Sequence, residues 1–219
     1  MKKTKFLLVE GSDDKSFFQQ FFESLKIDYE KEIEIIEMKT KYTKTVEWKE
    51  RLNAIKEKFK EENNILGIIV DSDNKLEKTI KDIQAAFNEL DIKETIENQK
   101  FIKINENLKI GLFICEPRDL ESLCLNIIKE NSPSELKEIQ DFLDKKKQKH
   151  KKIYHEEKKD LQAYLTYKQF IEEKSEFQLF LATQYNYKFA YSPGTASQKG
   201  YIKFDLFKDL KKFLENFRS

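Results

Sequence analysis

Short runs of consecutive apolar residues alternate with stretches of helical periodicity along the first 130 residues of the chain. Four or five aliphatic or aromatic residues in a row are typical of a strand that is buried on both faces. Apolar residues that recur every three or four positions are typical of an amphipathic helix. Strand candidates are 5–10, 32–38, 65–71, 109–115 and, more weakly, 100–104. Helix candidates are 13–25, 46–59, 76–90 and 120–128.

This alternation predicts an α/β fold. Strands joined by helices of this length need right-handed crossovers, which give a mainly parallel sheet flanked by helices. The pattern changes after residue 130, because 135–187 is helical without strand-like runs and an amphipathic helix follows at 204–217. We therefore expect an α/β domain over 1–130 and a helical extension over 131–219. The extension includes a loop around Pro193-Gly194, and its closing helix is expected to pack on the first domain.

The composition is that of a globular protein and narrows the function classes. The 219 residues are 39% hydrophobic, and 41 basic residues nearly balance 40 acidic ones, for a net charge of +1. A polyanion would therefore have to bind a local patch. Cys115 and Cys124 form no Cys-x-x-Cys pair, which favours buried thiols in a reducing compartment over a zinc site. The apolar run after Lys5 is too short for a signal peptide or a membrane span, so we expect a cytoplasmic protein without a membrane partner.

Carboxylates stand where two of the predicted strands end. Glu10 follows the first strand, and Asp71 and Asp73 follow a later one. Because ligands of α/β sheets bind at the carboxyl ends of the strands, we expect these acids to converge there. Residues two apart on an extended chain also project to the same side. Hard oxygen ligands of this kind suit Mg²⁺ or Mn²⁺, and a magnesium ion held by two or three carboxylates readily adds phosphate oxygens.

These residues resemble the Toprim domain, which is shared by topoisomerases, bacterial primases, small ribosomal-RNA maturases and the overcoming-lysogenization-defect nucleases. The resemblance lies in Val9-Glu10-Gly11-x-x-Asp14, followed by an apolar strand that ends in Asp71-x-Asp73. Three further segments resemble a family of small stand-alone bacterial Toprim proteins catalogued as a domain of unknown function. They are Gly111 to Pro117 with Leu120-Glu121, Pro193-Gly194-Thr195-Ala196, and Gly200-Tyr201 before the last helix.

The resemblance implies a role for each matching acid. Glu10 matches the Toprim glutamate, which is a general acid or base in some members and a metal ligand in the nucleases. Asp71 and Asp73 match the metal-binding pair. Glu121 looks like the additional acidic ligand of the nuclease-type members. Asp14 looks like the acid at the top of the first helix, and the alternative for this residue is a first-turn acid favoured by the helix dipole.

The basic groups of such a site are less clearly marked. The related nucleases use a lysine near the scissile phosphate, and Lys199 in the Pro-Gly loop is the candidate in this chain. The family's lysine stands more often one position earlier, where this chain has Gln198. Arg118, a scarce residue type here, either neutralises phosphate or forms a structural salt bridge with Asp119 or Glu121.

The sequence therefore predicts a Mg²⁺-dependent nuclease of Toprim type that hydrolyses RNA or DNA. Its catalytic residues would be Glu10, Asp71, Asp73 and Lys199. Its metal ligands, for Mg²⁺ or Mn²⁺, would be Glu10, Asp14, Asp71, Asp73 and Glu121. Resemblance to the overcoming-lysogenization-defect nucleases implies a role in phage defence or in RNA turnover during stress. The alternative is a catalytically silent Toprim module that binds nucleic acid or a protein partner, and the sequence leaves open the oligomeric state and the need for a partner ATPase.

Overall fold

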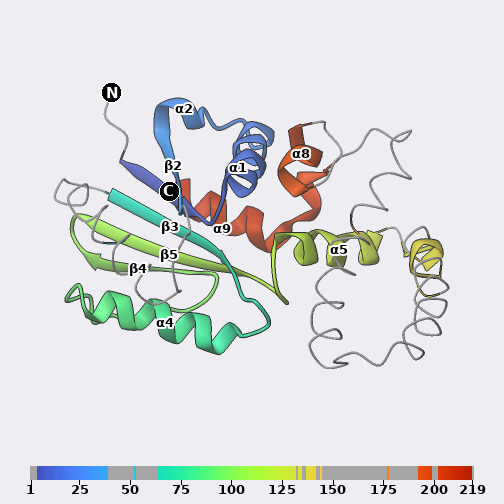
Figure 1. Cartoon of the computed structure of the whole chain (residues 1–219). Coiled ribbons are helices and arrows are strands. Elements are labelled where there is room, and N and C mark those ends of the chain that lie inside the picture. The colour runs from blue at the N-terminus through green and yellow to red at the C-terminus, as the bar shows by residue number, and fades with distance from the viewer. Residues whose placement is uncertain are drawn as a thin grey trace, which may run out of the picture.

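A five-stranded sheet with the strand order β2-β1-β3-β5-β4 forms the centre of the protein (Figure 1). The computed structural model describes residues 4–38, 52, 64–131, 133–134, 137–141, 144, 177, 192–198 and 202–218. The strands are β1 (Lys5–Val9), β2 (Ile33–Glu37), β3 (Asn64–Asp71), β4 (Lys100–Asn105) and β5 (Leu108–Cys115). All neighbouring pairs are parallel except β4 with β5. The predicted α/β fold with a mainly parallel sheet is confirmed.

Helices cover both faces of this sheet. α1 (Ser12–Ser24) and α9 (Lys208–Arg218) lie on one face, and α4 (Leu76–Asn88) lies on the other (Figure 1). α5 (Leu120–Asn131) extends past the carboxyl ends of the strands, and α8 (Pro193–Gln198) lies beside α1. Two short turns, α2 (Tyr29–Glu32) and the 3-10 helix η2 (Phe204–Leu206), precede β2 and α9.

Side chains of each strand alternate between two hydrophobic cores. Leu7 and Val9 of β1 face the core that holds the phenylalanines of α1 and α9, whereas Phe6 and Leu8 face the core beneath α4. The phenylalanines of α1 and α9 in the first core are Phe17, Phe18, Phe21, Phe22, Phe213 and Phe217, all at 2% exposure or less. Burial of one such ring stabilises the fold by about 2 kcal/mol, so the last helix is held firmly against the sheet.

Two lysines also bind the carboxyl end of α9. Lys5, at the start of β1, donates to the carbonyl of Arg218, and Lys109 of β5 donates to the carbonyl of Asn216 at 3.4 Å. These carbonyls belong to the last turn of the helix. They have no hydrogen-bond donor within the helix, and this end of the helix carries a partial negative charge. The described end of the predicted extension therefore packs on the sheet. Most of 131–191 lies outside the described residues, so the domain division after residue 130 stays a prediction.

The predicted strands and most of the predicted helices agree with the structure. All five strands form at the expected places, and the predicted helices 13–25, 76–90 and 120–128 correspond to α1, α4 and α5. The predicted helix at 46–59 lies outside the described residues except for Leu52, which is buried. The Pro-Gly segment was expected to be a loop, and this prediction is wrong for 193–198, which form α8. Proline at the first helical position favours such a start, because its fixed φ is already helical.

Two glycines create the space that the aromatic rings of this core occupy. Gly67 of β3 and Gly111 of β5 are register partners in adjacent strands. A Cβ atom on Gly67 would lie 3.1 Å from the Phe217 ring, and one on Gly111 would lie 2.4 Å from the Phe101 ring. The Phe101 ring stacks on Phe213 of α9, with 4.7 Å between the centroids. The missing side chains thus allow the rings to approach the sheet.

We predict that Gly111→Ala lowers the free energy of unfolding by about 2 kcal/mol, because the new methyl group overlaps the Phe101 ring. Chemical denaturation followed by circular dichroism measures the change. Phe101→Leu supplies the control, because the smaller side chain leaves room for the methyl group. Gly111→Ala should therefore lower the free energy of unfolding clearly less in the Phe101→Leu variant than in the native protein. An equal loss in the two proteins would contradict the overlap.

Candidate functional site

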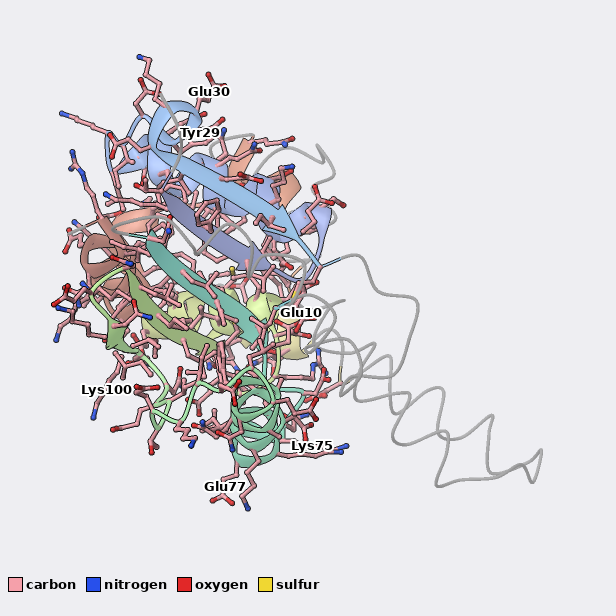
Figure 2. The ribbon with its side chains drawn as sticks, turned by 90° about the vertical axis from the view of Figure 1, so that its left-hand side faces the viewer. Glu10, Tyr29, Glu30, Lys75, Glu77 and Lys100 are labelled. Carbon is pink, nitrogen blue, oxygen red and sulfur yellow. The ribbon has the colours of Figure 1, made fainter. Side chains whose placement is uncertain are left out.

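Glu10, Asp14 and Asp71 lie together at the carboxyl edge of the sheet. Glu10 follows β1, Asp71 is the last residue of β3, and Asp14 belongs to the first turn of α1. Since β1 and β3 are parallel neighbours, their ends lie side by side. The N–H of Asp71 donates to Oε1 of Glu10 at 3.0 Å, which ties the two strand ends together. Figure 2 shows Glu10 at this edge of the sheet.

The start of α1 turns Asp14 back toward the end of β1. Gly11 occupies the N-cap position with an extended backbone, at φ −139° and ψ 178°. Its N–H donates to Oδ2 of Asp14 at 2.9 Å, which is the bond that the third residue of a capping box makes. The carboxylate of Asp14 is therefore held beside the residue that follows Glu10.

Burial and mutual repulsion raise the pKa of two of these carboxyls. Removal from water, together with the charges of Glu10 and Asp14, raises the pKa of Asp71 to about 9. Burial likewise raises the pKa of Asp14 to about 7, again with a contribution from the charge of Glu10. Both effects disfavour the ionised form, so Asp71 carries a proton at neutral pH when no cation is present.

Two more acids come from the start of α5. Asp119 precedes the helix, and its Oδ1 accepts hydrogen bonds from the N–H and hydroxyl of Ser122 at 2.9 and 2.7 Å. It therefore acts as the N-cap of α5. The charges of Asp119 and Glu121 both raise the pKa of Asp71, which places the start of α5 within electrostatic reach of the end of β3. Asp119 was not among the predicted site residues, although an aspartate directly before a helix is a capping signal.

Arg118 forms a buried salt bridge with Asp119. Its Nε donates to Oδ2 of Asp119 at 2.9 Å, and both side chains are about 6% exposed. This is the salt bridge that the sequence offered as the alternative to a phosphate contact. The positive charge next to the acidic cluster is therefore neutralised within the protein.

Asp73 lies in a different environment from Asp71. The strand stops at Asp71, and Asp73 has a left-handed φ of 49° and is exposed. Its N–H donates to the carbonyl of Arg118 at 2.9 Å, and the hydroxyl of Ser72 donates to the carbonyl of Pro117. The expectation that both acids lie on an extended strand is wrong, because β3 ends at Asp71 and Asp73 lies in a turn. A metal-binding role for Asp73 stays a prediction.

The Pro-Gly segment docks on α1 through Asp13 rather than through the site itself. Asp13 belongs to the first turn of α1, and Gly11 holds the N-cap position. The carboxylate of Asp13 instead accepts hydrogen bonds from the hydroxyl of Ser192 and, at 3.1 Å, from the N–H of Gly194. Lys199, the predicted catalytic lysine, lies outside the described residues.

The cysteines are buried free thiols, as expected. Burial, with Asp71 as the largest charge contribution, raises the pKa of Cys115 well above its usual value, and burial does the same for Cys124. Cys115 is the register partner of Asp71 at the end of β5. A neutral thiol therefore lies against the acidic cluster and adds no charge to it.

The donor chemistry of the acidic edge suits a hard divalent cation. Within the described residues, no group of three or more His, Cys, Asp or Glu side chains is already arranged to hold a metal ion. Magnesium is usually held by only one or two carboxylates and completes its shell with water and phosphate oxygens. Glu10, Asp14 and Asp71 offer such oxygens, and a cation would relieve the repulsion that, together with burial, raises the pKa values of Asp14 and Asp71.

The fold and this edge define a class of protein: an α/β protein with a mainly parallel sheet and a carboxylate cluster at the strand ends. A family model matches residues 4–218, and the chain belongs to that family, described as "Protein of unknown function (DUF3226)". Comparison with curated proteins and with solved structures finds no match. In the part of the chain that the structure describes, no helix has the length and apolar character to cross a membrane. The Toprim resemblance stays a prediction.

We predict that Asp71→Asn stabilises the metal-free protein in a pH-dependent way. The pKa of Asp71 is higher in the folded state than its ordinary value of 3.8, so folding takes up a proton. This contribution is complete below about pH 4 and is lost as the pH rises toward 9. Asn is neutral throughout, so the free energy of unfolding of the variant relative to the native protein should be about 4 kcal/mol higher at pH 8 than at pH 5.

Urea denaturation of the metal-free protein at several pH values measures this difference. Asp91→Asn is a matched control, because Asp91 is exposed in a turn at φ 63°, which asparagine adopts readily. The pH dependence of Asp71→Asn is measured relative to this variant. A gain for Asp71→Asn that stayed constant from pH 5 to 8 would show that ionisation of Asp71 is not its cause.

Proposed function

We propose that this protein is a Mg²⁺-dependent nuclease of Toprim type that hydrolyses phosphodiester bonds of RNA or DNA. The observation that carries the proposal is the meeting of Glu10, Asp14 and Asp71 where two parallel strands end. Ligands of α/β sheets bind at this edge. The same residues carry the resemblance to the Toprim pattern, and this resemblance supplies the class of reaction.

The proposed ligands of Mg²⁺ or Mn²⁺ are Glu10, Asp14, Asp71, Asp73 and Glu121. When bound, the cation would polarise the phosphodiester and supply a water of lowered pKa. The chain contributes orientation, since the N–H of Gly11 holds Asp14 and the N–H of Asp71 holds Glu10. Asp71 would release its proton as the cation binds, because a metal ligand has to be ionised.

The charge balance at this edge supports a strict need for a cation. The charges of four other carboxylates raise the pKa of Asp71 there, and the nearby Arg118 is already paired with Asp119. A nucleic-acid backbone is repelled by such a surface in the absence of metal. We therefore propose that the divalent ion is needed for binding of the nucleic-acid phosphate at this edge as well as for cleavage of the phosphodiester bond.

A catalytically silent binding module is the second candidate. The absence of a ready-made metal cage among the described residues favours it, as does the nearly neutral net charge. This candidate predicts binding of nucleic acid or of a protein partner without cleavage. The two candidates therefore differ in a single measurable step.

We predict metal-dependent cleavage that the acidic edge controls. The purified protein is incubated with mixed RNA and DNA substrates in Mg²⁺, in Mn²⁺ or in chelator, and the products are separated by electrophoresis. Asp71→Asn and Glu10→Gln should each lower the cleavage rate by about 100-fold or more, because each removes an oxygen ligand. Glu77→Gln is the matched control, since Figure 2 shows Glu77 on α4 and away from Glu10.

Each outcome of this assay separates the candidates. Cleavage that needs metal, is lost in Asp71→Asn and is kept in Glu77→Gln supports the nuclease. Cleavage that survives Asp71→Asn comes from a contaminating enzyme and contradicts the proposal. Metal-dependent binding without cleavage supports the silent module. If cleavage is found, plaque counts on cells that express the native protein or Asp71→Asn test the proposed role in phage defence, which equal counts would rule out.

A further inference from the structure

Asp13 joins two segments that lie far apart in the sequence. It belongs to the first turn of α1, directly before the site residue Asp14. One oxygen of its carboxylate accepts the hydroxyl hydrogen of Ser192, and the other accepts the N–H of Gly194 at 3.1 Å. Both donors lie at the start of α8, so this carboxylate holds the first turn of one helix against the first turn of another.

Gly194 makes this approach possible. A Cβ atom at this position would lie 2.3 Å from the backbone oxygen of Asp13 and 2.4 Å from Oδ1 of the same residue. Real Cβ atoms do not approach that closely, and the backbone oxygen is fixed within α1, so a side chain here would push the helices apart. The contact therefore depends on a glycine for its space and on Asp13 for its hydrogen bonds.

α8 contacts both α1 and α5, the two helices that carry proposed metal ligands. It packs along α1 and also touches α5, and Figure 1 shows it beside α1. Ala196 and Ser197 of α8 are 0% and 2% exposed, and Ala196 belongs to the core that α1 and α5 also line. Asp14 stands in the first turn of α1 and Glu121 in the first turn of α5. The charge of Glu121 contributes to the raised pKa of Asp14, so these carboxylates are within electrostatic reach.

We infer that α8 is a positioning element that fixes the first turns of α1 and α5, and so sets the placement of Asp14 relative to Glu121. Asp13, Ser192 and Gly194 are the positioning residues of this contact. None of them is a proposed ligand. The inference rests on the proposed function only where it concerns metal affinity, because the restraint on the two helix turns is independent of any metal.

The test uses the full chain and breaks the contact without changing charge. Gly194→Ala introduces the overlap with Asp13, and Ser192→Ala removes one hydrogen bond and leaves the backbone free to dock. Asp13 itself is not substituted, because loss of its negative charge would weaken cation binding for a separate reason. Ser16→Ala is the matched control, since the hydrogen bond of the Ser16 hydroxyl stays within α1, where it donates to the carbonyl of Ser12 at 3.1 Å.

We predict that Gly194→Ala weakens Mn²⁺ binding about tenfold, as is usual when a group that orients metal ligands is lost. Ser192→Ala should weaken it about threefold, since the Gly194 bond remains, and Ser16→Ala should leave it unchanged. Isothermal titration calorimetry with Mn²⁺ alone measures the affinities. A cooperative unfolding transition verifies that each variant is folded, and Ser192→Ala carries the test if Gly194→Ala does not fold.

A second measurement on the metal-free protein keeps this inference separate from the proposed function. Hydrogen exchange of the amides in the first turns of α1 and α5 should be faster in Gly194→Ala and Ser192→Ala than in Ser16→Ala. Folded variants with native exchange and native Mn²⁺ affinity overturn the inference. If the native protein binds no Mn²⁺, the proposed metal chemistry fails, and the exchange rates alone then decide whether α8 holds the two turns.

Discussion

The parallel pairing of β1 with β3 determines where the acidic residues can meet. The register sets Leu8 opposite Ile68, so β1 ends beside the last residues of β3 and the N–H of Asp71 reaches the side chain of Glu10. A shift of one residue would turn Asp71 to the other face of the sheet, away from α1 and Asp14. The register is strongly specified, because the buried side chains of both strands alternate between two different cores. The packing of the cores therefore fixes the geometry of the site.

The sequence predicted those parts of the fold and site that depend on local pattern. Buried strands read as apolar runs, so Glu10 and Asp71 could be placed at strand ends without coordinates. Asp73 was misplaced because its left-handed turn is stabilised by the carbonyl of Arg118, a contact between distant segments that no local pattern reports. The partner of Asp13 was missed for the same reason, since it lies about 180 residues along the chain.

The acidic edge is a costly arrangement for the folded protein. Burial and repulsion raise the pKa values of Asp14 and Asp71, which means that the fold keeps these carboxyls under conditions that disfavour their charge. Arg118 does not offset this cost, since Asp119 binds it and also caps α5. Perturbed carboxyls of this kind cluster at functional sites, where stability is given up for chemistry. The raised pKa values of Asp14 and Asp71 therefore favour the proposed cation-binding role over a purely structural one.

The carboxyl-terminal segments complete both the core and the surroundings of the site. Gly67 and Gly111 leave space on the sheet that the ring of Phe217 and the stacked pair Phe101 and Phe213 fill, so without α9 the same strands would expose a trough lined by apolar side chains. Exposure of such a surface to water is unfavourable by roughly 25 cal/mol per Å². The strands of the first 130 residues therefore depend on α9 for burial, just as the first turn of α1 depends on α8 for its contacts. The site therefore depends on contacts between early and late segments of the chain. The strand pattern predicts that Glu10 and Asp71 lie at strand ends, but it does not predict these long-range contacts.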